Sequence, residues 1–135
     1  MSKLPDWAHT MISPLDAKMG FEMTELTPER VVGSIPVEGN QQPFGMLHGG
    51  ASGVLIETLA SMGAAAYGRD SGKVGLGVDL NVTHLRPGKS GRVTGVATAV
   101  RLGRTVAVYA VEIRDDEGRL TATGRLTCQM VELRS

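Results

Sequence analysis

The sequence predicts a protein of the α+β class, in which a curved antiparallel sheet wraps around one long central helix. The chain has 135 residues, which is enough for one domain with its own core. Residues 50–66 have the spacing of a helix and are nonpolar almost all round. Strand patterns come before this segment and follow it in an unbroken series, which is typical of a helix packed against an antiparallel meander.

The sequence predicts an N-terminal arm followed by a single domain. Residues 1–12 form the arm, either loose or a short helix, and residues 13–135 form the single domain. Ser13 and Pro14 are typical of the cap and the first position of a helical turn, and Gly20 ends that turn.

Two strands follow, over residues 21–26 and 31–37. Residues 27–29 between them contain proline and threonine and favour a turn. Residues 38–47 are polar and contain glycine and proline, so we expect an irregular loop before the central helix.

The central helix is predicted from its spacing. Over residues 50–66 the bulky apolar residues recur every three or four positions, and the other face consists almost wholly of small residues. A helix of this kind is buried on most sides. Gly68 and the polar run after it end the helix.

The remainder of the chain predicts strands over residues 76–83, 92–100, 105–114 and 120–131. The first of them alternates between apolar residues and small or polar ones, which predicts one apolar face. That face consists of Leu76, Val78, Leu80 and Val82. Residues 115–118 have the composition of a hairpin turn.

Composition excludes several classes of protein. Lys and Arg number 14, as do Asp and Glu, so the net charge is 0, whereas a nucleic-acid binder carries a basic excess. The single cysteine, Cys128, excludes a disulfide scaffold, and the three histidines are too scattered for a metal site. The N-terminus lacks the apolar core of a secretory signal, and the longest weakly polar stretch contains Glu57. We therefore expect a cytoplasmic protein that binds neither membranes nor nucleic acid.

Glu57 is the first candidate for a functional residue, because it is the only charged residue between positions 49 and 67. A carboxylate in apolar surroundings is costly unless it has a function or finds hydrogen-bond donors. The plainer interpretation is a glutamate at the solvent edge of the helix, and its apolar neighbours argue against it. Ser61 lies one turn later on the same side, either as a hydroxyl that serves the carboxylate or as a small residue that eases packing.

His48 and Gly49 stand where the loop becomes the helix. The first amides of a helix carry partial positive charge and suit an oxyanion that forms on a carbonyl, although a plain glycine-rich helix start looks the same. Gln42 in the preceding loop offers both a donor and an acceptor, or is simply solvated. A group of basic residues could bind phosphates, although each of them taken singly is more simply a solvated surface charge. The group consists of His84, Arg86, Lys89, Arg101 and Arg104.

The motifs around these candidates resemble a known family. The run QPFGMLHGGAS from Gln42 to Ser52, followed by ETLAS from Glu57 to Ser61, is similar to the hotdog-fold acyl-CoA thioesterases of the PaaI-like superfamily. The branch it resembles contains 1,4-dihydroxy-2-naphthoyl-CoA thioesterase and the Arthrobacter-type 4-hydroxybenzoyl-CoA thioesterase. The run NVTHLR at 81–86 and the meander from 91 to 127 also look like that branch, so the resemblance covers residues 15–130.

The resemblance implies a hotdog fold and hydrolysis of an aromatic acyl-CoA to the free acid and CoA. Glu57 then looks like the catalytic carboxylate, either nucleophile or general base. His48, Gln42 and the Gly49 amide resemble the groups that hold the thioester carbonyl, and Ser61 the hydroxyl that positions water. The residues that fall where the family binds CoA are His84, Leu85, Arg86, Pro87, Gly103, Arg104 and Thr105.

Members of the family are dimers, usually paired into tetramers, so the resemblance implies a homodimer at least and favours a homotetramer. No metal or other cofactor is implied, since CoA is part of the substrate. The sequence agrees with a shared site, because His48 and Glu57 are about 10–14 Å apart along a helix axis, too far to flank one carbonyl. Two alternatives stay open: a hotdog 3-hydroxyacyl dehydratase and an acyl-CoA-binding module without turnover.

Overall fold

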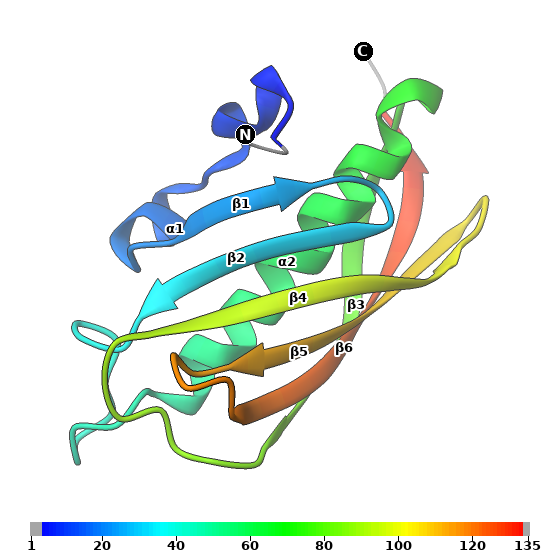
Figure 1. Cartoon of the computed structure of the whole chain (residues 1–135). Helices are drawn as coiled ribbons and strands as arrows, with labels where there is room; N and C mark the ends of the chain where they lie inside the picture. Colours follow the sequence, from blue (N-terminus) through cyan, green and yellow to red (C-terminus); the bar gives the residue numbers. More distant parts are fainter. Residues whose placement is uncertain (1–3, 134–135) are drawn as a thin grey trace.

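The computed structural model describes residues 4–133, which form one six-stranded antiparallel sheet and one long helix (Figure 1). The strands lie in the order β1-β2-β4-β5-β6-β3. In chain order the elements are η1 (Asp6–Met11), α1 (Pro14–Lys18), β1 (Glu22–Leu26), β2 (Arg30–Pro36), α2 (Gly49–Gly68), η2 (Arg69–Ser71), β3 (Lys73–His84), β4 (Arg92–Leu102), β5 (Val106–Arg114) and β6 (Leu120–Glu132). The predicted fold class is confirmed.

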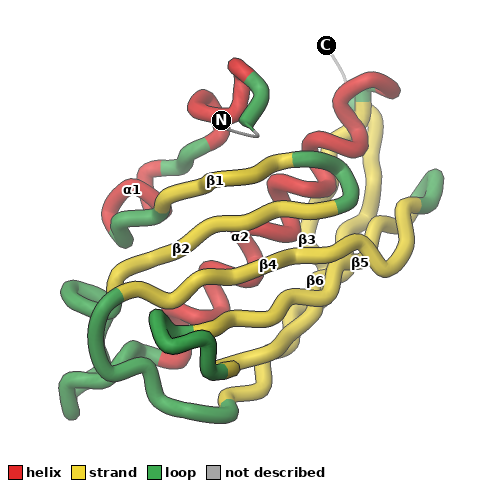
Figure 2. Tube along the Cα trace, in the orientation of Figure 1, coloured by secondary structure: helices red, strands yellow, loops and turns green. Residues whose placement is uncertain are grey.

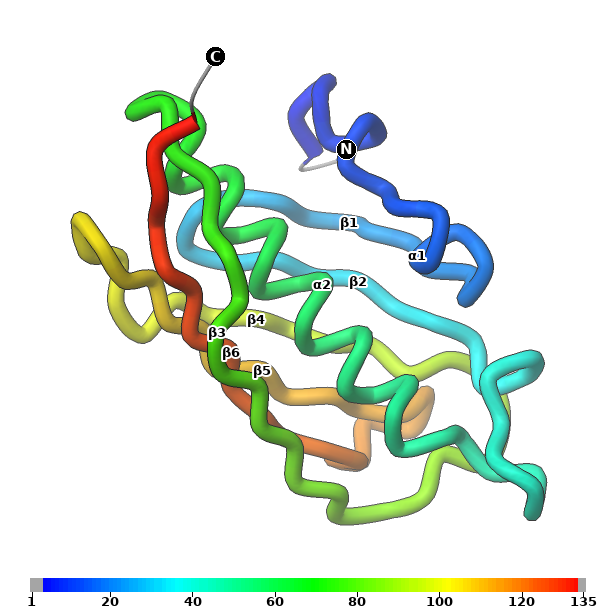
Figure 3. Tube along the Cα trace, turned by 180° about the vertical axis from the view of Figure 1, so that it is seen from behind, coloured from blue at the N-terminus to red at the C-terminus, as the bar shows by residue number. Residues whose placement is uncertain are grey.

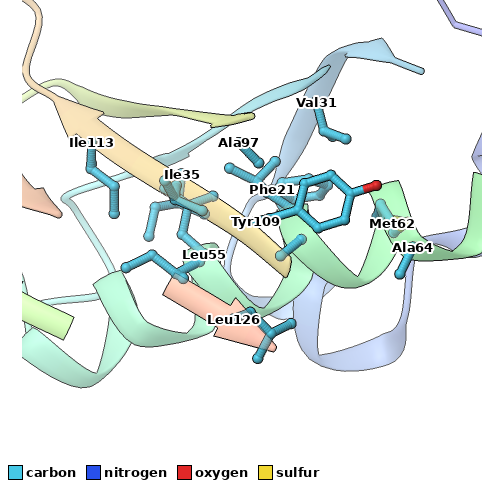
Figure 4. Close-up of a cluster of buried hydrophobic side chains, with 14 of the residues drawn as sticks. Phe21, Val31, Ile35, Leu55, Met62, Ala64, Ala97, Tyr109, Ile113 and Leu126 are labelled. Carbon is cyan, nitrogen blue, oxygen red and sulfur yellow. The ribbon is translucent and has the colours of Figure 1, made fainter. Parts of the chain in front are cut away.

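The sheet curves around α2, and the core fills the space between them (Figure 2). Leu55, Ile56 and Leu59 of α2 are almost completely buried against the apolar faces of the central strands. Figure 4 shows Leu55 beside Ile35 and, farther along α2, Met62 beside Tyr109 in this core. From behind, α2 lies along the concave face of the sheet, with α1 on one side of it and β3 on the other (Figure 3).

The N-terminal segments follow the local rules of the sequence. Ser13 caps α1, because its Oγ accepts a hydrogen bond from the Asp16 amide at 3.1 Å, and Gly20 follows with a φ of 75°. The short helix expected in the arm is the 3₁₀ helix η1, and residues 1–3 lie outside the described part. Trp7 of η1 lies under the Arg69 guanidinium, 4.2 Å from the ring centroid.

The prediction of a single apolar face on β3 is wrong in one respect. A bulge between Gly77 and Asp79 inserts Val78 as an extra residue in the pairing with β6. Gly77 faces α2 before the bulge, and Leu80 and Val82 face it afterwards. Leu76 therefore points to the opposite face from Leu80, because a shift of one residue exchanges the two faces of a strand.

β3 forms one edge of the sheet and pairs only with β6 among the described strands. It is 12 residues long, and Leu76, Val78 and Leu80 are 54%, 62% and 40% exposed. A long edge strand with apolar side chains is a template for pairing with another chain, so natural proteins normally cover it. This edge is therefore available for pairing with another chain.

Candidate active site

A cavity of about 620 Å³ lies beside α2, and Glu57 is one of the residues that line it. We call it the Glu57 cavity. It is walled by α1 on one side, β3 on the other and the first three turns of α2 between them. Its lining residues from α2 include Gly49, Gly50, Gly53, Val54, Glu57 and Thr58.

Two neighbours hold the Glu57 carboxylate in place. The Ser61 Oγ donates a hydrogen bond to Glu57 Oε2 at 3.1 Å, as their separation of one helical turn predicts. On the other side the carboxylate lies directly against Gly77 of β3, where a Cβ atom would clash with Oε2. Sequence reasoning missed Gly77, although a glycine inside a strand is a recognised sign of close approach.

The N-terminus of α2 is built around two imidazoles. His48 caps the helix, because its Nδ1 accepts a hydrogen bond from the Gly50 amide at 2.8 Å. A neutral ring that accepts at Nδ1 carries its proton on Nε2, which is then a donor. His84, at the end of β3, packs over Gly49 so closely that a Cβ there would be 2.9 Å from its Nε2. Gly49 therefore allows the His84 ring to lie directly against the first turn of α2.

Gln42 lines a second cavity of about 370 Å³, which we call the loop cavity. Its Oε1 accepts hydrogen bonds from the amides of Phe44 at 2.6 Å and Met46 at 3.3 Å, so the side chain shapes its own loop. Glu57 does not line this cavity, and Gln42 does not line the other. Gly49 and His84 line both.

The residues expected to bind CoA fall into two groups that one chain does not bring together. Leu85, Arg86 and Pro87 line the loop cavity near the start of α2. Residues 103–105 form the turn between β4 and β5, at the other end of the molecule (Figure 1). There the Tyr67 hydroxyl, near the end of α2, donates to the Gly103 carbonyl oxygen at 3.0 Å. The 20 residues of α2 separate the two groups by about 30 Å.

Cys128 lies in the core behind the Glu57 cavity and pairs with Gly77 across the sheet. Burial raises the pKa of its thiol to about 11, and the nearby negative charge of Glu57 adds to the effect. The thiol therefore stays protonated and behaves as a small hydrophobic side chain, as expected from the sequence.

No helix within residues 4–133 is long and apolar enough to cross a membrane.

The six-stranded sheet wrapped around one helix places the chain in the class of hotdog-fold proteins. Residues 44–122 match the family model described as Thioesterase superfamily. The chain belongs to this family and is a thioester hydrolase.

Individual relatives cover nearly the whole chain. The crystal structure of thioesterase HI1161 from Haemophilus influenzae has a TM-score of 0.88 and 32% sequence identity, over 99% of this chain and 96% of that one. The structure of a variant of thioesterase PA1618 from Pseudomonas aeruginosa has a TM-score of 0.88 and 36% identity, over 96% of both chains. ComA2 of Bacillus subtilis, named as a candidate esterase, is 39% identical over 128 residues, which are 94% of this chain and 98% of ComA2.

Proposed function

We propose that this thioester hydrolase acts on an acyl-CoA with an aromatic acyl group and releases the free acid and CoA. The observation that carries the proposal is Glu57, which lines a cavity together with the first residues of α2 and whose carboxylate accepts a hydrogen bond from Ser61. The resemblance of the sequence to thioesterases of aromatic acyl-CoAs supports the choice of acyl group. The cavity suits it too, because Val54, Leu80 and Val82 give it apolar walls.

Glu57 starts the reaction in one of two ways. Its carboxylate attacks the thioester carbonyl, the carbon–sulfur bond breaks, and the resulting anhydride is hydrolysed by water. In the other route the carboxylate takes a proton from water, and the water oxygen attacks instead. In both routes the thioester and one water give an acid and a thiol, and we assign to Ser61 the task of orienting the water.

The carbonyl oxygen gains negative charge in either route and needs donors. We assign this task to the Gly49 amide, with Gln42 and the Nε2 of His48 as further donors, since fixed dipoles aimed at an oxyanion lower the barrier most. We expect no metal or other cofactor to take part, so a chelator should leave the rate unchanged.

We further propose that two subunits share each site. A two-fold axis between the two copies of β3 makes these strands antiparallel, so the two central helices also run in opposite directions. If His84 lies opposite Gly77 of the partner subunit, the Gly49 end of one helix meets Glu57 of the partner subunit. The same operation brings the partner's Arg104 toward Arg86, because Lys73 at the start of β3 donates to the Arg104 carbonyl oxygen at 2.8 Å. A homodimer therefore completes the site, and two such dimers form the expected homotetramer.

A relative gives independent support for the pair Gln42 and Glu57. Two structures of a Staphylococcus aureus protein of this fold, 32% and 33% identical to this chain, carry alanine in place of a glutamine and of a glutamate. Those two residues are separated by the same number of positions as Gln42 and Glu57.

A cytoplasmic location stays a prediction.

A thiol-release assay with a panel of CoA thioesters tests the proposal. We expect benzoyl-CoA and related aromatic thioesters to be hydrolysed faster than straight-chain ones, and a crotonyl thioester to be neither hydrated nor preferred. Hydration of the crotonyl thioester would identify a dehydratase, and binding without thiol release would identify a module without turnover. Single turnover in ¹⁸O-water then separates the two routes, because only nucleophilic attack places the label in Glu57.

A further inference from the structure

A buried carboxylate on the wall of the Glu57 cavity has no part in the proposed chemistry. Asp16 of α1 is only 5% exposed. Its Oδ1 accepts a hydrogen bond from the Thr58 hydroxyl at 2.7 Å, and its Oδ2 accepts one from the Ser13 hydroxyl at 2.9 Å. No cation pairs with it among the described residues. Both donors are neutral hydroxyl groups, so the carboxylate serves mainly to hold them.

The Asp16–Thr58 hydrogen bond joins two elements that are far apart in the chain. Thr58 follows Glu57 directly on α2, and both line the cavity. Ser13, Leu15 and Asp16 line it from the other side. In Figure 3, α1 and β3 lie on opposite sides of α2, so α1 is the wall that faces Leu80 and Val82 of β3.

α1 cannot keep this position by itself. It has five residues, which is too short for a stable helix in water. Its middle residue, Asp16, accepts a hydrogen bond from Thr58 of α2, and beyond its C-terminal end the Asn40 side chain donates to the Met19 carbonyl oxygen at 2.8 Å. The position of the wall therefore depends on a few side-chain hydrogen bonds.

Leu15 is the side chain that this arrangement presents to the cavity. It is 53% exposed although it is large and apolar, and it lines the cavity beside Asp16. Truncating it leaves the core unchanged, because it contributes little buried area. An apolar side chain in this position can pack against an acyl group that reaches it, and it sterically excludes an acyl group that is too long.

We propose that α1, held to α2 by the Asp16–Thr58 hydrogen bond, is the wall that limits the size of the acyl group, and that Leu15 is its specificity-determining residue. The inference rests on the proposed function, because it names which part of the cavity receives the acyl group. Asp16 acts as a positioning residue, since it acts through α1 and not on the substrate.

The test compares two thioesters that differ by one ring, benzoyl-CoA and 4-phenylbenzoyl-CoA. The measured quantity is the ratio of kcat/KM for the larger substrate to that for the smaller, which a general loss of folded protein does not change. Leu15→Ala should raise this ratio about tenfold, since a few methylenes in an apolar pocket discriminate by that order. Thr58→Val, which keeps the shape and removes the donor, should raise it as well by loosening α1.

Lys18→Ala is the matched control, because Lys18 is an exposed residue of α1 that does not line the cavity. Its ratio should equal that of the wild type. A ratio for Leu15→Ala within about twofold of the wild type overturns the inference while the proposed function stands. A wild-type protein that hydrolyses neither thioester overturns the proposed function and this inference with it.

Discussion

Glu57 depends on its immediate neighbours for its position. The Ser61 hydroxyl holds one oxygen, and Gly77 leaves room for the same oxygen on the side of the sheet. The bulge that follows Gly77 then turns Leu80 toward the cavity. A single carboxylate thus depends on a helical turn and on the absence of a Cβ atom.

Glu57→Gln should keep the fold and lose most turnover. The amide has the same shape but cannot attack a thioester or accept a proton from water. A nucleophile or general base contributes a factor of about 10² or more, so kcat should fall by at least that much. Thiol release measures the rate, and circular dichroism checks the fold. A loss below about tenfold would refute the assignment.

Gly77→Ala should lower kcat while leaving the protein folded. The new Cβ atom would overlap Glu57 Oε2, which sits at the end of a flexible side chain and can swing away. The cost therefore falls on the geometry of the site more than on the free energy of unfolding. Wild-type kcat in this variant would show that the contact has no role in catalysis.

The Cys128 thiol makes stability depend on pH in alkaline solution. In the unfolded chain it ionises near its ordinary pKa of 9.0, whereas burial raises the pKa to about 11 in the folded protein. Between these values the unfolded state has already released the proton, so the free energy of unfolding falls as pH rises. The slope is at most about 1.4 kcal/mol per pH unit. Urea unfolding at several pH values should show a shallower fall for Cys128→Ala than for the wild type.

At the scale of elements, the sequence predicted those whose signals are local. The helix pattern gave α2 within two residues at each end, and the cap Ser13 and the turn at 115–118 were correct. The prediction of a single apolar face on β3 was wrong, because the bulge arises from pairing with β6 and cannot be recognised in the alternation of apolar and polar residues. The contact between Glu57 and Gly77 was missed for the same reason: it joins segments that only the tertiary fold brings together.

The arginines expected to bind CoA phosphates lie in two connecting segments: Arg86 in the loop after β3, and Arg104 in the turn between β4 and β5. Replacing Arg86 or Arg104 by alanine should raise KM more than it lowers kcat, because a phosphate contact binds substrate and transition state alike. The effect should shrink at high salt, which screens exposed charges. Steady-state kinetics at two ionic strengths measure this. A fall in kcat with constant KM would assign these residues another role.

At the scale of the whole molecule, one chain has an uncovered β3 edge and a divided site. Gln42 and Glu57 line different cavities, and the two groups of CoA residues lie at opposite ends of α2. The pairing through β3 that we propose would account for all three features. We therefore expect sedimentation to show a dimer or a tetramer at assay concentration, and a fully active monomer would contradict this.

The most direct test of the central claim mixes two variants that we expect to be inactive on their own, Gln42→Ala and Glu57→Gln, and refolds them together. Random pairing makes half of the dimers mixed, and each mixed dimer then has one site with both residues intact. If the site is shared, roughly a quarter of the wild-type activity should return. Activity no greater than the sum of the two separate variants would show that each chain carries its own complete site.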